Sequence, residues 1–456
     1  MSPHLSARLV AATGLALFAM FFGAGNLIIP TMIGVEAGPA ASRAMLGFAL
    51  TGVLLPALST IAATTVRPEE RRLADRIGPR LGLLVTAAIF LGCGMIYGIP
   101  RVGAVSYEMS LAPALGGGGD GVLAADAGGA GGIAARVAYS AVFFGLAYVL
   151  TRRPSRILTV LGGWLTPLLL ALLAALVVSV LQVAPVHPQP SATYARSPEL
   201  AGFVQGYFTM DALAALLFAG VVIGSFTAAG LDRQAVRRGT VISAVIAAAL
   251  LVAVYAGLVR VGMVGAGSNG AEVLAGVAQE RFGTAGQLLF GAIVVLACLT
   301  TTIGLSSASA QFFHELWPRL SEHAWLTLTL GVSFLLSNLG LEAILAVVAP
   351  INQLLYPIVI CLILVALLEV LLRGVRAGHG AGRLHWAYRL PAWVAGLLSV
   401  PEALWSTQAA VFAPLRQLLD AFPLGELQLA WVVPALVALA VGLLVDLTGR
   451  RPTAAA

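Results

Sequence analysis

The sequence predicts an all-α integral membrane protein with twelve transmembrane helices: an inverted repeat of five plus five helices, with helices 1 and 6 broken, followed by two more. Three observations support this fold class. Only 26 basic and 20 acidic residues occur among 456 positions, long apolar runs recur along the chain, and arginines gather in alternate loops. An average soluble domain carries a charge at about one position in four. The chain therefore needs a lipid bilayer as its surroundings.

Twelve apolar runs are long enough to cross a membrane, which takes about 20 residues. The polar stretches between them are too short for a soluble domain. In chain order the runs cover residues 9–35, 44–65, 82–110, 135–151, 157–182, 205–229, 240–264, 285–314, 323–338, 342–372, 388–410 and 427–448.

The arginine distribution orients these spans. If the N-terminus lies in the cytoplasm, the cytoplasmic loops and ends hold nineteen arginines and the opposite side holds four. Cytoplasmic loops of membrane proteins carry such an excess of positive charge. We therefore expect a multi-pass protein with both termini in the cytoplasm.

The composition also excludes several classes of function. Lys is absent, so the chain has neither a Walker A lysine nor an amine for a Schiff base. The three cysteines follow no metal-binding spacing, and no convergent set of catalytic side chains is visible. A channel would need a continuous polar lining, whereas the polar residues here cluster at mid-depth. We expect no enzymatic activity, no cofactor and no nucleic-acid partner.

The first span contains a candidate break at Gly23-Ala24-Gly25-Asn26, one turn before Pro30. Unwound backbone at membrane depth is tolerated where it is buried or lines a cavity. Its free carbonyl groups can hold a cation, and the N–H groups of the following half-helix favour a carboxylate. Alternatively, these small residues only let a second helix pack closely.

The sixth span contains Asp211 within an apolar run, and the third span contains Arg101. Charged groups at membrane depth are rare and usually functional. At about 1.5 Å per residue their heights in the bilayer differ by only about 5 Å. They are candidates for an intramembrane ion pair, with Glu108 on the same helix face as Arg101 but nearer the outer surface. Such a pair could instead serve helix packing alone.

In the eighth span, hydroxyl groups interrupt an apolar helix at Thr300-Thr301-Thr302. Adjacent threonine hydroxyls, together with the carbonyl group of Ala297 one turn earlier, could supply three oxygen ligands to a sodium ion. The alternative is that the hydroxyls bond carbonyl groups of their own helix or join neighbouring helices.

The breaks lie five spans apart. This is the spacing of an inverted repeat with a binding site between its halves, and an odd number of spans inverts the second half. We predict a first repeat over residues 1–182, a second over 205–372 and two additional helices over 388–448. The pattern indicates a secondary transporter that works by alternating access.

Several motifs together resemble the bacterial branched-chain amino acid:cation symporter family, and they occur in a consistent order over nearly the whole chain. The resemblance implies sodium-coupled uptake of L-leucine, L-isoleucine and L-valine across the cytoplasmic membrane, on the leucine-transporter-type fold. The motifs are Phe21-Phe22-Gly23-Ala24-Gly25-Asn26, Ile99-Pro100-Arg101 with Ser106-Tyr107-Glu108, Gly206-Tyr207-Phe208-Thr209-Met210-Asp211, Ala297-Cys298-Leu299-Thr300-Thr301 and Ser337-Asn338-Leu339-Gly340.

The same resemblance implies roles for individual residues. The sodium ligands would be Ala19, Phe22, Ala297, Thr300 and Thr301. The substrate would lie between the two breaks, with its carboxylate on the N–H groups around Gly23, Ala24, Gly25 and Asn26 and its ammonium near Tyr207, Thr209 and Asp211. The sequence departs from sodium-coupled relatives at Asp211, where an uncharged small residue is usual. Asp211 could therefore pair with Arg101 or with the substrate ammonium, and a proton-coupled amino acid permease of the same fold is the alternative function.

Overall fold

The computed structural model describes residues 5–23, 25–67, 70, 72–112, 130–153, 157–186, 189–209, 211–339, 341–375, 384–406, 410–412 and 414–448. Within these ranges the chain is helical and has no strand, which confirms the all-α class. Eight helices of the described ranges are long and apolar enough to cross a membrane, and two shorter apolar helices accompany them. The count of twelve spans and the five-plus-five repeat stay predictions.

The chain forms two compact units. The first unit comprises Met1–Ile61 and Cys93–Ile344, and the second comprises Ala62–Gly92 and Leu345–Ala456. Each unit therefore combines segments that lie far apart in the sequence. The predicted segments 1–182, 205–372 and 388–448 are defined by repeated helix order, whereas these units are defined by contacts. The predicted segments therefore stay a prediction.

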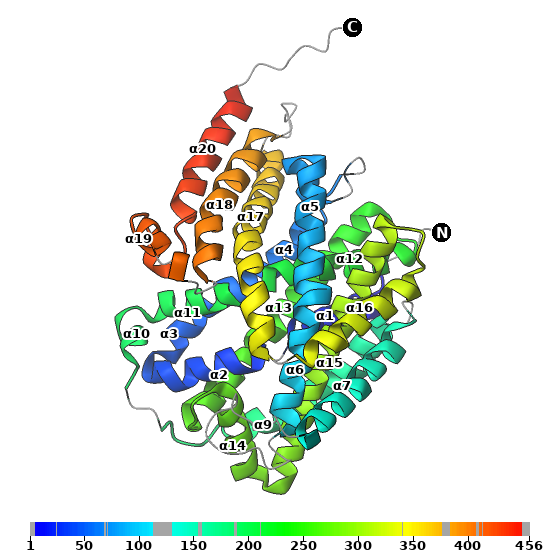
Figure 1. Ribbon diagram of the computed structural model, residues 1–456, viewed down its shortest axis with the longest axis vertical. Helices are drawn as coiled ribbons and strands as arrows, with labels where there is room; N and C mark the ends of the chain where they lie inside the picture. Colours follow the sequence, from blue (N-terminus) through cyan, green and yellow to red (C-terminus); the bar gives the residue numbers. More distant parts are fainter. Residues whose placement is uncertain are drawn as a thin grey trace. The chain divides into compact units, whose positions relative to one another are not determined.

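The first unit contains most of the helices in Figure 1, and polar side chains cap several of them. Asp232, Asn269 and Ser321 accept backbone N–H groups at the starts of α13, α14 and α16. The helices are α1 (Ala7–Phe21), α2 (Gly25–Ala37), α3 (Ala41–Ala49), α4 (Leu55–Ala63, which continues into the second unit), α6 (Gly98–Ser110), α7 (Ala130–Thr151), α8 (Ile157–Val160), α9 (Thr166–Ser179), α10 (Ala192–Arg196), α11 (Pro198–Phe208), α12 (Asp211–Ala228), α13 (Arg233–Val264), α14 (Gly270–Phe282), α15 (Thr284–Leu316) and α16 (Glu322–Ser337).

The second unit contains α5 (Pro79–Ile89), α17 (Leu341–Val375, whose first turn belongs to the first unit), α18 (Trp386–Ser406), α19 (Pro414–Asp420) and α20 (Val432–Thr448). Prolines lie inside α17 and α18, and the helices continue past them. This is common in membrane helices, where neighbouring groups compensate for the lost backbone hydrogen bond.

In the first unit, α2 packs directly against the backbone of α13, and glycine on both helices makes this possible. A Cβ added at Gly34 would lie 2.1 Å from the carbonyl oxygen of Val259, and one added at Gly262 would lie 1.9 Å from that of Thr31. Both distances are far below van der Waals contact, so a larger residue would force the helices apart. Small residues permit such close packing between membrane helices. The contact fixes α2, the second half of the broken first span.

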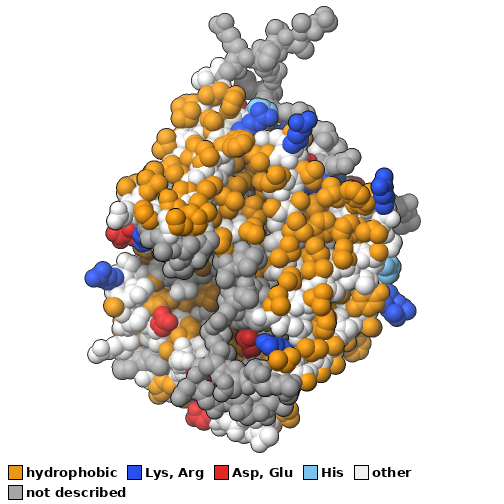
Figure 2. All heavy atoms as spheres, in the orientation of Figure 1, with side chains coloured by type: hydrophobic (Ala, Val, Ile, Leu, Met, Phe, Trp, Pro, Cys, Tyr) orange, Lys and Arg blue, Asp and Glu red, His pale blue; other side chains and the backbone are white. Residues whose placement is uncertain are grey.

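Hydrophobic side chains cover much of the surface that Figure 2 shows for the described residues. Trp164 and Leu288 are each 74% exposed, and Val142 is 72% exposed. Soluble monomers rarely expose apolar surface on this scale. Lipid chains are the natural covering for such side chains, which agrees with a multi-pass membrane protein.

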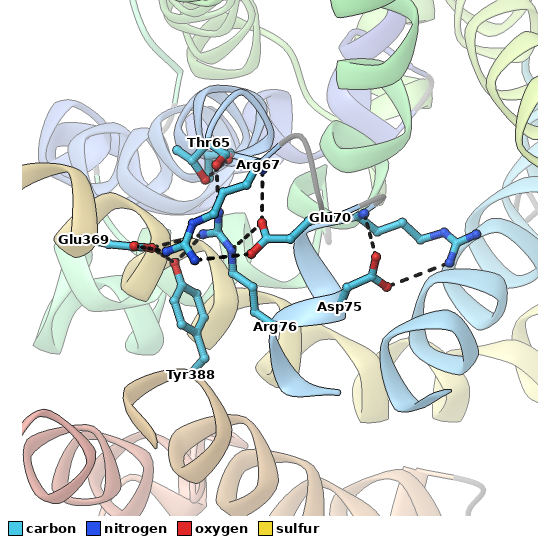
Figure 3. Close-up of polar contacts among 9 residues, drawn as sticks. Thr65, Arg67, Glu70, Asp75, Arg76, Glu369 and Tyr388 are labelled. Carbon is cyan, nitrogen blue, oxygen red and sulfur yellow. Dashed lines mark hydrogen bonds and ion pairs between the residues drawn. The ribbon is translucent and has the colours of Figure 1, made fainter. Parts of the chain in front are cut away.

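A buried polar network joins the segment before α5 to α17 and α18 within the second unit (Figure 3). Arg76 donates to Glu70 at 3.1 Å and to the carbonyl oxygen of Thr65 at 2.7 Å. Glu369 accepts from Arg67 and, at 2.9 Å, from the hydroxyl of Tyr388.

Arg76 also lies 3.5 Å from Glu369 and donates to Tyr388, which closes the network. The Arg76 and Glu369 side chains are only 4% and 6% exposed. Two guanidinium groups thus share two carboxylates, which is the arrangement that makes buried charges tolerable.

Candidate functional site

The first predicted break is present. Helix α1 ends at Phe21 and α2 begins at Gly25, and Phe22 between them has a non-helical ψ of 76°. The N–H group of Gly23 donates to the Phe21 carbonyl at 2.9 Å, and that of Asn26 donates to the Gly23 carbonyl at 3.0 Å. Ala24 lies outside the described residues. The N–H groups of Gly23 and Asn26, which the sequence assigned to the substrate carboxylate, are thus bonded to carbonyl groups within the break.

At the second predicted break, α11 ends at Phe208 and α12 begins at Asp211, and Met210 between them lies outside the described residues. The hydroxyl of Thr209 turns back to the Gly206 carbonyl at 2.8 Å. Tyr207 is buried at 5% exposure, so its ring belongs to the packed interior. Asp211 is the first residue of α12, a position at which the helix dipole favours a negative charge.

A side-chain hydrogen bond joins the two breaks. The amide nitrogen of Asn26 donates to Asp211 at 3.1 Å and to the Phe21 carbonyl at 2.6 Å. Both partners are acceptors, so the amide orientation of Asn26 follows from its contacts. Asn26 is only 4% exposed. The structure thus brings together residues 185 positions apart that the sequence assigned to one substrate site.

Helix α15 presents its hydroxyl groups to the end of α1. The Thr300 hydroxyl lies 2.9 Å from the Ala19 carbonyl and 3.0 Å from the Ala297 carbonyl. The Thr301 hydroxyl donates to the Met20 carbonyl at 3.0 Å. Four of the five expected sodium ligands thus lie beside the first break, and Met20 joins them, which the sequence reasoning missed.

Phe22, the fifth expected sodium ligand, lies in the break itself. The hydroxyl oxygen of Thr301 would be 3.2 Å from a Cβ added at the next residue, Gly23. The oxygens gathered here are uncharged hydroxyl and carbonyl groups. Such oxygens suit a hard cation without adding negative charge to the membrane interior.

Arg101 approaches the first break from α6. Its Nη1 donates to the Tyr97 hydroxyl at 3.0 Å, and its guanidinium lies 5.5 Å from the centre of the Tyr97 ring. Among the described residues, no ion pair joins Arg101 to Asp211. The direct pair considered from the sequence is therefore replaced by the Asn26–Asp211 bond. Glu108 lies two turns further along α6.

The segment before Arg101 is interrupted, which the sequence did not predict. Gly94 has non-helical angles, φ −94° and ψ −107°, within a wide helical stretch over Phe90–Ile96. A Cβ added at Gly94 would lie 2.4 Å from the Ser309 hydroxyl of α15, so the interruption is packed against that helix. This irregular stretch immediately precedes α6, the helix that carries Arg101.

Tyr255 of α13 is a further residue that the sequence reasoning missed. Its ring is fully buried, stacks on Phe22 with centroids 6.0 Å apart and meets Phe48 edge-on at 5.4 Å. Its hydroxyl has no hydrogen-bond partner within the described part of the chain. A lone tyrosine inside the apolar run of residues 240–264 was the available signal.

Comparison with known proteins gives a consistent result over the full length. Residues 6–448 match the family described as branched-chain amino acid transport protein. The chain is 39% identical to the branched-chain amino acid permease BrnQ of Corynebacterium glutamicum, covering 97% of this chain and 96% of that protein. It is 34% identical to the branched-chain amino acid transport system 3 carrier protein of Pseudomonas aeruginosa, covering 98% of each.

Among solved structures, the chain is similar to a transporter of the nucleobase-cation-symport-1 family in a closed conformation with bromovinylhydantoin bound. The TM-score is 0.53, and the alignment covers 95% of this chain and 91% of that one. Sequence identity is 14%, so the likeness concerns the fold alone. Both chains therefore share a helical fold.

Proposed function

Since the chain belongs to the branched-chain amino acid transport protein family, whose members are transporters and not enzymes, we propose that it imports L-leucine, L-isoleucine and L-valine together with sodium. The proposed mechanism is alternating access of one site to the two sides of the bacterial cytoplasmic membrane. The proposed layout has inverted repeats over 1–182 and 205–372, additional helices over 388–448, and both termini in the cytoplasm.

The observation that carries the substrate site is the hydrogen bond between Asn26 and Asp211, which joins both helix breaks. In this proposal the carboxylate of the amino acid lies at the N-terminal end of α2, where the helix dipole favours an anion. Its ammonium lies toward Asp211 and the backbone near Thr209. The substrate then bridges the two breaks and replaces their missing helical contacts.

The proposed substrate class agrees with the side chains around the first break. Phe22 stacks on Phe18 at 5.4 Å and on Tyr255 at 6.0 Å, which makes this region apolar and aromatic. An apolar site of this kind suits an aliphatic side chain. One methylene group changes binding in such a site by only about 1–3 kcal/mol, so leucine, isoleucine and valine should all be accepted.

The proposed sodium site lies between the end of α1 and α15. Its ligands are the carbonyl oxygens of Ala19 and Ala297, the hydroxyl of Thr300, and the hydroxyl of Thr301 with the backbone of Met20 or Phe22 beside it. A cation here would be coordinated by the oxygen atoms of these hydroxyls. Each hydroxyl would keep its proton but turn it away from the carbonyl group to which it now donates. Because Ala19 and Phe22 also end α1 at the substrate site, cation binding would order the first break.

Uptake by the purified protein tests this proposal. In proteoliposomes, labelled leucine should enter rapidly when an inward sodium gradient is imposed and slowly when sodium is equal on both sides or replaced by choline. The proton-coupled alternative predicts that uptake depends on protons and not on sodium. An inward proton gradient would then accelerate uptake in sodium-free buffer, and Asp211→Asn would abolish that response. Leucine uptake that follows neither gradient would contradict coupling altogether.

Removing one hydroxyl should separate the cation role from the substrate role. We expect Thr301→Ala to raise the sodium concentration for half-maximal leucine uptake by about tenfold, because loss of one oxygen ligand removes about 1–2 kcal/mol. The relative uptake of leucine, isoleucine and valine should not change. The measurement is the initial rate of uptake against sodium concentration.

The next residue, Thr302, provides the matched control. Its hydroxyl is buried and has no hydrogen-bond partner among the described residues. Thr302→Ala removes the same atoms one position further along α15 and should leave the sodium dependence unaltered. If Thr301→Ala and Thr302→Ala show the same sodium dependence of uptake, Thr301 is not a sodium ligand.

A further inference from the structure

Arg101 has hydrogen-bonding capacity that the described residues do not use. A guanidinium carries five N–H donors, and here Nη1 bonds the Tyr97 hydroxyl, the single hydrogen-bond partner of this side chain within the described ranges. The remaining edge of the group faces the first break. The side chain is half-buried. Arginine at membrane depth normally has a carboxylate or carbonyl partner, so the donors that no described residue accepts suit an anionic ligand.

The group that Arg101 faces is the beginning of α2. A Cβ placed on Gly25, the first residue of that helix, would lie 3.7 Å from Nη2. The N-terminal end of a helix carries a partial positive charge. Two positive groups therefore meet at Gly25, and no carboxylate of the described residues bonds either of them. Such an arrangement is unfavourable by itself, and it becomes favourable when a carboxylate binds both.

A negative charge stands on the other side of the same break, but it does not neutralise Arg101. Asp211 is held by Asn26 at 3.1 Å and forms no ion pair with Arg101 among the described contacts. The site therefore presents a guanidinium group and, apart from it, a carboxyl group. An α-amino acid carries the complementary pair, because its carboxylate and ammonium are attached to the same carbon atom.

We propose that Arg101 binds the α-carboxylate of the transported amino acid through Nη2, which bonds none of the described residues, at the N-terminal end of α2. Asp211 then receives the ammonium, and the two side chains together require a substrate with both charges. This inference rests on the proposed function and extends it, because backbone groups alone would accept any small anion. Tyr97 is a positioning residue that holds the guanidinium toward Gly25.

Ligands that lack one charge test the proposal. Binding of leucine, leucinamide and 4-methylpentanoate to the full-length protein in detergent should be measured by isothermal titration for the wild type and for Arg101→Gln. We expect the substitution Arg101→Gln to raise the dissociation constant of leucine about a hundredfold, because a charge-assisted hydrogen bond is lost. Leucinamide, which has no carboxylate, should bind Arg101→Gln as well as or better than the wild type. Arg101→Lys should retain an intermediate affinity for leucine.

Two comparisons separate this role from a structural one. Arg43→Gln removes an exposed arginine, 64% exposed in a surface pair with Glu199, and should leave all three affinities unaltered. The melting temperature of Arg101→Gln should stay close to that of the wild type. The inference is overturned if Arg101→Gln binds leucine as tightly as the wild type does. It is also overturned if the substitution lowers the affinities for leucine and leucinamide by the same factor. If the wild type itself binds no branched-chain amino acid, the proposed function fails first, and this inference fails with it.

Discussion

Replacing Asp211 by Asn is expected to lower leucine uptake at subsaturating leucine by about a hundredfold or more. Asn has nearly the same shape and still offers an oxygen to the Asn26 amide, so the hydrogen bond between the breaks can persist. The negative charge that faces the substrate ammonium is lost. Removing one partner of a buried charge pair costs about 2–5 kcal/mol, equal to a factor of about thirty to several thousand. The measurement is the initial rate of uptake at equal amounts of reconstituted protein.

An exchanged variant shows whether the position of the charge matters. The double substitution Asn26→Asp with Asp211→Asn keeps one carboxylate and one amide across the same hydrogen bond. It moves the negative charge onto α2, near Gly25 and the guanidinium of Arg101. We expect this variant to remain inactive, because the added carboxylate would occupy Arg101. Full uptake by Asp211→Asn, or recovery in the exchanged variant, would contradict a specific role for Asp211.

Replacing Glu369 by Gln is expected to give the largest loss of stability. Glu369 accepts from Arg67 and Tyr388 and pairs with Arg76 at 3.5 Å. Gln keeps the size of the side chain but leaves two guanidinium groups with less negative charge in a site that excludes water. Breaking a buried pair in this way costs about 3–5 kcal/mol. The free energy of unfolding, measured by denaturant titration in detergent micelles, should fall by about this amount.

The matched control is Asp420→Asn in the same unit. Asp420 pairs with Arg416 at 3.0 Å one helical turn away, but these side chains are 37% and 30% exposed. Exposed pairs contribute about 0–1 kcal/mol, so this variant should unfold close to the wild type. If Glu369→Gln and Asp420→Asn lose the same small stability, the buried network does not hold the second unit together.

The helix breaks could be predicted because they are local. Gly23, Gly25 and Asn26 within one apolar run, and Asp211 within another, disfavour a continuous membrane helix wherever the rest of the chain lies. The break beginning at Gly94 could not be predicted in the same way. The chain has 51 glycines, and nothing in the sequence around Gly94 distinguishes it from the others as the site of an interruption. The interruption there is packed against Ser309, which lies 215 positions away.

The partners of the charged residues were beyond the reach of sequence. Helical rise gave Arg101 and Asp211 similar depths, but depth does not fix the rotation of a helix or which neighbour it meets. In the structure Asp211 accepts a hydrogen bond from Asn26, and the guanidinium of Arg101 lies near Gly25. Likewise, Arg76 counted as one of the charges of a cytoplasmic loop, whereas its side chain is 4% exposed and bonded to Glu369, 293 positions on.

Three properties of this protein could be predicted without a structure: it is a helical membrane transporter, it resembles branched-chain amino acid carriers, and its first and sixth spans are interrupted. These properties follow from composition, from runs of apolar residues and from short motifs, which need no knowledge of distant contacts. Tertiary structure alone decided which groups meet at the breaks. Hydrogen bonds and ion pairs depend on separations of a few ångströms, and only the packing of helices such as α2 against α13 sets those separations.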